Sequence, residues 1–180
     1  ILGTVHLINI SMPLHRNDNY FLNSKWRGCK NQAGGGVLIM NVIHIIDILI
    51  WIFGPIISVN GRKTIVRKNI VNVEDSIGVL LEFENGLKSV ISATNVAKET
   101  KPIRMEVYGT KNTVIVEDFC ITDKSINKIA QPLGKKVLKK CFFYQIKDMI
   151  DSIKNNRKPL TNGEAGLIVL QTIDQIYKSC

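Results

Sequence analysis

"SIGVLLEFENGLKSVISATNV", residues 76–96, is the stretch that decides the fold of this 180-residue chain. Two runs rich in Val, Ile and Leu meet at Asn85-Gly86, a pair that favours a tight hairpin turn because both residues tolerate positive φ. The sequence therefore predicts two antiparallel strands joined at this turn. Apolar residues fall on both faces of the first run, which indicates that a partner subunit covers the second face of the sheet.

The segments on either side of this hairpin extend the same sheet. A second hairpin is expected over residues 103–117, turning near residues 109–112, and single strands over residues 3–12 and 56–66. Sequential hairpins form an antiparallel sheet. Residues 13–33 are polar and rich in Asn, so we expect a long loop there.

Three segments predict helices. The apolar run 36–53 has apolar residues on all sides and stops at Gly54-Pro55, so we expect a mostly buried helix. A second helix is expected from near Phe142 and an amphipathic one at the C-terminus. This order predicts an α+β fold: a mostly antiparallel open sheet with helices packed on one face and the other face used for subunit pairing.

The positive charge of the chain is concentrated in one region. The net charge is +9, and residues 123–158 hold ten Lys/Arg against three Asp. Such a segment would suit nucleic acid, yet no aromatic residue interleaves with the lysines of residues 124–140. We therefore expect a solvated loop and helix face and no nucleic-acid partner. The alternative, a nucleic-acid binder, predicts a salt-dependent affinity for DNA.

Cysteine spacing and apolar runs bear on the cellular location. Four cysteines are scattered along the chain: Cys29, Cys120, Cys141 and Cys180. Without a C-x-x-C pair they suggest reduced thiols in a cytoplasmic protein, and no metal site. The run 37–53 has the length of a membrane span, but its polar residues make a membrane helix unexpected. The chain opens directly on a strand-like segment, which we interpret as the start of a fragment.

Asn41, His44 and Asp47 are the unusual residues of the apolar run. On an α-helix, Asn41 and Asp47 both lie next to His44. Oxidation of a secondary alcohol needs a base for the hydroxyl proton, and an imidazole, with an ordinary pKa of about 6.5, suits that role. The competing interpretation is a buried histidine that Asp47 holds for structural reasons, with Asp47 alternatively satisfying a backbone group or Arg27.

The loop before this helix carries candidate ligand contacts. Glycines at 34–36 let the backbone approach a ligand, and N–H groups at a helix start attract anions; the alternative is a tight entry turn. Arg16 and Arg27 are candidates for a carboxylate or pyrophosphate, because a guanidinium forks onto such groups. Tyr20 is a candidate to stack on a sugar or hydrogen-bond to it, and Trp26 lines the same cleft or belongs to the core.

These residues together resemble the C-terminal domain of the glucose–fructose oxidoreductase, inositol dehydrogenase and rhizopine catabolism family (Gfo/Idh/MocA). The resemblance spans nearly the whole chain in the same order and rests on Arg16, Tyr20, Trp26-Arg27-Gly28, Gly34–Gly36, His44-x-x-Asp47, Trp51, Gly54, "VEDSIGVLLEFENG" (73–86), "RMEVYGTKNTVIVED" (104–118) and "PLTNGEAGLIVLQTIDQIYKSC" (159–180).

The resemblance implies that residues 1–180 are a substrate-binding and dimerisation domain, preceded in the family by a Rossmann domain that this chain lacks. It implies an NAD(P)-dependent oxidoreductase acting on a sugar, with NAD or NADP bound mainly by the absent domain, and this fragment inactive alone. Subunits are expected to form a homodimer or dimer of dimers through the sheet. The implied sites are catalytic His44, substrate contacts Arg16, Tyr20, Trp26, Arg27, Asn41 and Asp47, and cofactor contacts Gly35 and Gly36.

One departure narrows the implied substrate. Many members place an aspartate four residues before the histidine, whereas this chain has Met40, followed by Asn41. That pattern resembles the branch acting on nucleotide-linked amino sugars or sugar acids, and it favours a UDP-sugar type substrate over a polyol. The alternative function is a non-catalytic sugar-binding or dimerisation module of the same family.

Overall fold

The computed structural model describes residues 1–24, 26–118, 120–122 and 135–180, with the backbone alone for residues 135–139. Its elements, in chain order, are β1 (Val5–Pro13), α1 (Asp18–Leu22), α2 (Lys30–Ala33), the π-helix η1 (Leu38–Val42), α3 (Ile43–Phe53), β2 (Ile56–Thr64), β3 (Ser76–Phe83), β4 (Lys88–Thr94), β5 (Arg104–Gly109), β6 (Thr113–Glu117), β7 (Cys120–Ile121), α4 (Lys135–Lys154) and α5 (Gly163–Ser179). The fold is α+β, as the sequence predicts.

Both predicted hairpins are present. β3 pairs antiparallel with β4, and Gly86 in the connecting turn has a φ of 82°, which explains why glycine is needed there. The side chain of Asn85 accepts a hydrogen bond of 3.0 Å from the Leu87 N–H and closes the turn. β5 and β6 form the second hairpin.

The strands form one sheet in the order β2-β3-β4-β1-β5-β6-β7. β1 lies between the two hairpins, parallel to β4 and antiparallel to β5. A parallel pair cannot be joined by a tight turn, and the chain connects β1 to β4 through the helical segment and the first hairpin. The sheet is therefore mixed, although every other neighbouring pair is antiparallel.

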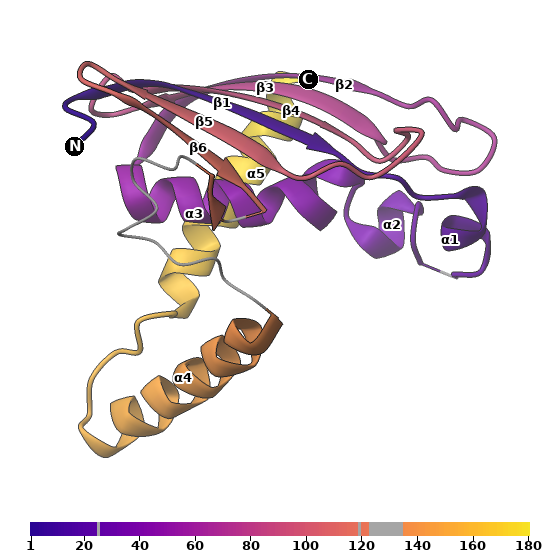
Figure 1. Ribbon diagram of the computed structural model, residues 1–180. Helices are drawn as coiled ribbons and strands as arrows, with labels where there is room; N and C mark the ends of the chain where they lie inside the picture. The colour runs from indigo at the N-terminus through magenta and orange to yellow at the C-terminus, as the bar shows by residue number, and fades with distance from the viewer. Residues whose placement is uncertain (25, 119, 123–134) are drawn as a thin grey trace.

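Helices α3 and α5 cover one face of this sheet, and the other face is open (Figure 1). Side chains alternate along the strands, so that Ile8, Ile10 and Met12 of β1 are buried on the helical side. The buried side chains of the sheet and of the helices form one core, whose fully buried members include Phe83, Leu81, Ile91, Ile45, Ile46, Leu49 and Ile176. The predicted packing of helices against one face is confirmed.

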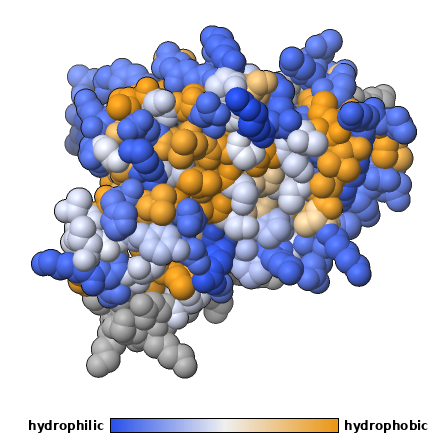
Figure 2. Space-filling view, turned by 90° about the horizontal axis from the view of Figure 1, so that it is seen from above, coloured by the Kyte–Doolittle hydropathy of each residue, from blue (hydrophilic) through white to orange (hydrophobic). Residues whose placement is uncertain are grey.

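The open face of the sheet mixes apolar and polar side chains. Figure 2 looks down on this face and shows apolar residues between polar ones. Leu80 and Val90 on this face are 46% and 43% exposed, and they lie opposite one another on β3 and β4. Beside them Arg104 bridges Glu106 and Glu117 at 2.9 and 2.7 Å.

Two predictions about the helical segment need correction. Residues 13–33 are not a plain loop, since they contain the short helices α1 and α2. The helix from residue 37 is not buried all round: Trp51 is 85% exposed and Ile52 is 54% exposed. Apolar residues on every side suggested full burial, yet the sheet and α5 cover only one side of this helix.

The segment Lys30–Phe53 is, by length and composition, apolar enough to cross a membrane. Within it Leu38, Val42, Ile45, Ile46 and Leu49 are buried in the core under the sheet, which is also how the central helix of a globular domain behaves.

α4 projects away from the sheet on the side of α3 (Figure 1). It begins at Lys135, seven residues before the predicted start. Phe143, Ile146 and Ile153 on it are 63%, 62% and 74% exposed. α5 is amphipathic, as predicted, with Val169, Thr172, Ile173 and Ile176 buried. Part of the basic segment, residues 123–134, lies outside the described residues.

Candidate functional site

A narrow pocket opens where the 13–28 segment meets the start of the long helix. It is lined by Arg16, Tyr20, Phe21, Trp26, Arg27, Gly28, Ala33, Gly35, Gly36, Met40, Asn41, Val73 and Asn95. Seven of the nine predicted site residues are therefore brought together. The other two, His44 and Asp47, do not line this pocket.

The wall of the pocket contributed by the 13–28 segment is an arrangement of cations and aromatic rings. The Arg27 guanidinium lies 4.4 Å from the ring centre of Tyr20 and 5.1 Å from that of Trp26. The Arg16 guanidinium lies 5.3 Å from the same Tyr20 ring. Stacking on ring faces holds each guanidinium in place. Arg16 Nη1 donates to the His15 carbonyl at 2.9 Å, which leaves the other N–H groups of Arg16 for a ligand.

The charge of this pocket favours an anion. Arg27 Nε is buried and has no hydrogen-bond partner among the described residues. An unpaired buried donor is costly, which makes it a natural place for a ligand oxygen. No acidic side chain is among the described lining residues, so nothing within the pocket neutralises the two arginines. The pocket is thus suited to a carboxylate or phosphate oxygen.

The 13–28 segment owes its shape to local capping. Asn17 is the N-cap of α1, and its side chain accepts a hydrogen bond of 3.0 Å from the Tyr20 N–H. Gly28 has a φ of 75°, and a Cβ there would lie 2.6 Å from a methyl group of Val71. The cap orients Tyr20, and the glycine lets the turn pack closely under the pocket. Trp26 is 41% exposed, which excludes it from the core.

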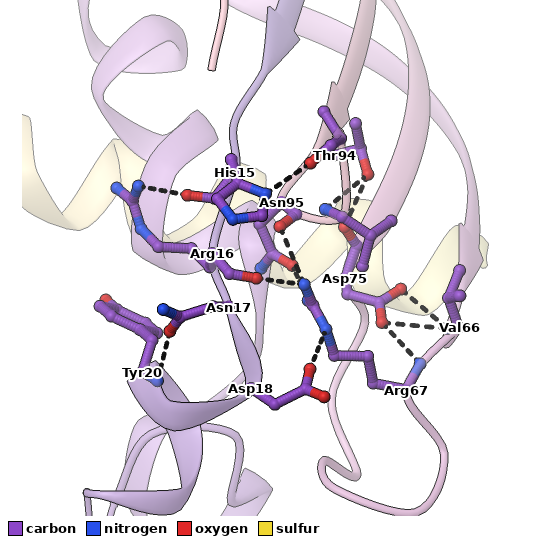
Figure 3. A network of polar contacts seen from close by, with 12 residues as sticks. His15, Arg16, Asn17, Asp18, Tyr20, Val66, Arg67, Asp75, Thr94 and Asn95 are labelled. Atoms are coloured by element: carbon purple, nitrogen blue, oxygen red, sulfur yellow. Dashed lines mark hydrogen bonds and ion pairs between the residues drawn. The ribbon is translucent and has the colours of Figure 1, made fainter. Parts of the chain in front are cut away.

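Arg67 ties this segment to the sheet (Figure 3). Its Nε pairs with Asp18 Oδ1 at 3.0 Å, and one terminal nitrogen donates to Asn95 Oδ1 at 3.0 Å. The other terminal nitrogen donates to the Arg16 carbonyl. Arg67 therefore holds three parts of the pocket surroundings with one planar group.

The start of the long helix is held by Glu74, which is 4% exposed. Its carboxylate accepts hydrogen bonds of 3.0 Å from the Gly36 and Leu38 N–H groups and one of 2.8 Å from the Tyr177 hydroxyl. The N–H groups that the sequence suggested for an external anion are therefore already paired within the chain. Gly35 and Gly36 do line the pocket. Their role in cofactor binding stays a prediction, and free N–H groups at the helix start no longer support it.

The glycines at the helix start are required by close contacts with the protein itself. A Cβ on Gly36 would lie 1.8 Å from the Glu74 carbonyl oxygen, and one on Gly35 would lie 2.0 Å from the Tyr177 hydroxyl oxygen. The sequence indicated a close backbone approach to a ligand. The structure places other segments of the chain at these positions.

The helix that carries Asn41, His44 and Asp47 begins with a π-helical turn, η1, that includes Asn41. The wider turn changes the angle between residues 41 and 44 from that of the α-helix assumed from sequence. Asn41 points into the pocket lining, while His44 and Asp47 are exposed. In the described part of the chain no hydrogen bond or ion pair joins Asp47 to His44 or to Arg27.

Sequence reasoning missed several residues that shape this site. Asn95 and Met40 line the pocket, and Arg67, Asp75 and Tyr177 hold its surroundings. Glu74 and Asp75 did carry a signal, because two adjacent acids directly before an apolar strand are unusual unless the fold satisfies them.

Comparisons with known proteins find relatives of this chain in sequence and in fold. An uncharacterised oxidoreductase of Synechocystis is 27% identical over 128 residues, covering 64% of this chain and 34% of that protein. The WlbA dehydrogenase of Bordetella pertussis, solved with NADH and UDP-GlcNAcA, matches 99% of this chain and 52% of its own at a TM-score of 0.80 and 22% identity. A levoglucosan dehydrogenase in complex with NADH matches 99% of this chain and 57% of its own at a TM-score of 0.78 and 17% identity.

The structural matches show a shared fold, and this chain spans about half the length of those two proteins. The sequence model of the GFO/IDH/MocA C-terminal domain matches residues 1–115, which is more than half of the chain. The α+β architecture agrees with the same assignment. This chain therefore belongs to the GFO/IDH/MocA C-terminal domain family.

Proposed function

We propose that this chain is the substrate-binding and catalytic half of an NAD(P)-dependent oxidoreductase that oxidises a hydroxyl of a nucleotide-linked sugar. The observation that carries this proposal is the pocket that gathers Arg16, Arg27, Tyr20, Trp26 and Asn41. Two guanidiniums suit phosphate or carboxylate oxygens, and aromatic rings suit a sugar or base face. WlbA, which shares the fold, was solved with UDP-GlcNAcA, a sugar that carries both kinds of anion.

We assign the acid/base role to His44. Its side chain is exposed on the helix that also supplies Asn41 to the pocket, so a substrate bound there has an imidazole within about one helical turn. The imidazole takes the hydroxyl proton of the substrate, and Asn41 hydrogen-bonds the sugar. The nicotinamide cofactor, when bound, supplies the hydride acceptor.

The exposed side of the long helix is the surface for the cofactor-bearing half. Trp51 on α3 and Phe143, Ile146 and Ile153 on α4 are exposed apolar side chains. Both helices lie on the same side of the sheet (Figure 1). Exposed apolar side chains that gather in one patch mark an interaction site. A second half docked there also closes the space beside His44 from water, as hydride transfer requires.

The open sheet face is the surface for subunit pairing. Leu80 and Val90 are exposed apolar side chains of β3 and β4, and the Arg104 ion pairs lie on β5 and β6 of the same sheet. Protein–protein interfaces combine apolar with polar and charged side chains in this way. We expect a homodimer or dimer of dimers.

The test uses the full-length protein with UDP-GlcNAcA and NAD, followed by the absorbance of the reduced nicotinamide. His44→Ala should lower kcat by about 10²–10⁴-fold, because general-base catalysis contributes that much. Arg27→Ala should raise KM by roughly tenfold or more, the value of a charge-assisted hydrogen bond. Lys98→Ala, an exposed cation outside the pocket, serves as the control and should leave both constants unchanged.

Near-normal turnover of the His44→Ala protein would remove this histidine from the mechanism. Tight binding of UDP-GlcNAcA by the wild-type protein without turnover would instead support the non-catalytic sugar-binding module.

A further inference from the structure

Two adjacent carboxylates lie under the pocket without lining it. Glu74 is 4% exposed and Asp75 is 1% exposed, and both sit directly before β3. Burial of a carboxylate is unfavourable unless hydrogen bonds replace its water, so both must be fully engaged by the fold. The hydrogen-bond partners of Glu74 and those of Asp75 belong to different segments of the chain.

Glu74 engages the wall formed by residues 35–41, which we call the helix wall. Gly36 donates to both carboxylate oxygens, at 3.0 and 3.1 Å, and Leu38 donates to one of them at 3.0 Å. The Val37 N–H donates to the Glu74 carbonyl at 2.9 Å. A negative charge at the start of a helix is favoured by the helix dipole, and here it fixes where the helix carrying Asn41 begins.

Tyr177 of the last helix, α5, also binds the Glu74 carboxylate. Its hydroxyl donates to Glu74 at 2.8 Å. Burial, reinforced by the negative charge of Glu74, raises the pKa of Tyr177 far above its ordinary value, so the hydroxyl stays a donor at any working pH. Through Glu74 the helix wall is thereby tied to α5, whose Tyr177 lies 103 residues after Glu74 along the chain.

Asp75 acts through Arg67 on the other wall of the pocket, which is formed by residues 16–20 and which we call the arginine wall. Its carboxylate accepts hydrogen bonds of 2.9 Å from the Val66 and Arg67 N–H groups. These bonds fix the backbone from which the Arg67 guanidinium reaches Asp18, Asn95 and the Arg16 carbonyl (Figure 3). The Asp75 carbonyl also accepts a bond of 2.9 Å from the Asn95 N–H.

We propose that Glu74 and Asp75 are positioning residues that hold the two walls of the pocket separately: Glu74 sets the helix wall with Asn41, and Asp75, through Arg67, sets the arginine wall with Arg16 and Tyr20. Neither carboxylate touches a ligand. The kinetic consequence rests on the proposed function, because only then does the helix that starts in the helix wall carry the catalytic His44, and the arginine wall bind the substrate anion.

The first test measures amide hydrogen exchange in the full-length protein without any ligand. Glu74→Gln and Tyr177→Phe should speed exchange in residues 34–42 by on the order of tenfold and leave residues 14–23 unchanged. Asp75→Asn and Arg67→Lys should speed exchange in residues 14–23 and leave residues 34–42 unchanged. Glu84→Gln, an exposed carboxylate at the tip of the β3–β4 turn, is the matched control and should change neither segment. Tyr177→Phe and Arg67→Lys keep the test decisive if a carboxylate variant fails to fold.

The second test is a kinetic split with UDP-GlcNAcA and NAD. The helix-wall variants should lower kcat by on the order of tenfold with little change in KM, and the arginine-wall variants should raise KM by a similar factor with little change in kcat. A merely structural role would lower the amount of folded enzyme and leave KM alone in all four variants.

Exchange that rises equally in both segments in every variant, or in neither segment, overturns the inference. A wild-type protein without turnover on nucleotide sugars refutes the proposed function, and the exchange pattern still decides whether the two carboxylates act on separate walls.

Discussion

Replacing Gly36 by alanine tests the contact on which the helix start depends. The added Cβ would lie 1.8 Å from the Glu74 carbonyl oxygen and 3.0 Å from the Glu74 backbone nitrogen, so either this segment or the loop before β3 must move. Overpacking of this kind costs about 1–3 kcal/mol. The displacement also lengthens the charge-assisted bond from the Gly36 N–H to the Glu74 carboxylate, which contributes about 1.5–3 kcal/mol.

The two effects together lower the free energy of unfolding by roughly 2.5–6 kcal/mol. For a domain of this size about 1 kcal/mol shifts the Tm by 2–4 °C, so the Tm of the Gly36→Ala chain should fall by roughly 5–24 °C. Thermal unfolding followed by far-UV circular dichroism measures this shift. Gly166→Ala is the matched control, because nothing lies within 4 Å of its Cβ inside α5.

Alanine is favoured over glycine in a helix by about 1 kcal/mol, so the control should raise the Tm by roughly 2–4 °C. The two substitutions add the same methyl group and should shift the Tm in opposite directions. A Gly36→Ala chain that melts within 2 °C of the wild type (a margin of about 1 kcal/mol) would refute the tight approach of Glu74.

Three further predictions concern other parts of the molecule. Leu80→Arg puts a charge on the open sheet face, and it should convert the full-length oligomer to smaller species in analytical ultracentrifugation; an unchanged sedimentation coefficient would place the interface elsewhere. The Leu160 N–H and the Arg157 guanidinium lower the pKa of Asp148 below its ordinary 3.8. The hydrogen bonds of this carboxylate, which link α4 to the following turn, are therefore complete above pH 3.8 and weaken as the pH falls through the lower pKa of the folded state. In the wild type, the exchange of the Leu160 amide should therefore become faster in acid, after correction for its intrinsic rate. In Asp148→Asn this dependence on pH should be absent. Leu49→Ala empties a fully buried site in the core and should lower the free energy of unfolding by about 2–5 kcal/mol in urea titration, whereas Leu170→Ala, 49% exposed on α5, should change it far less.

Local sequence signals predicted the elements of the fold but not their neighbours. The Asn85-Gly86 turn and the alternating strands were predicted correctly, because turn chemistry and side-chain alternation act within a few residues. The insertion of β1 beside β4 was not predicted, since parallel pairing joins residues about 80 positions apart without a turn signal. The exposed side of α3 was also missed, because an apolar side chain in the sequence does not show what covers it.

The sequence by itself determined the α+β class, the hairpins, and the residue types that suit an anionic sugar ligand: arginines, aromatic rings and an asparagine near a glycine-rich helix start. Only the tertiary structure decided that seven of these residues share one pocket, that His44 and Asp47 lie outside its lining, and that the helix-start N–H groups belong to Glu74. The physical reason is that a buried carboxylate must find donors wherever the fold supplies them. For Glu74 those donors come from 36 to 103 residues away along the chain.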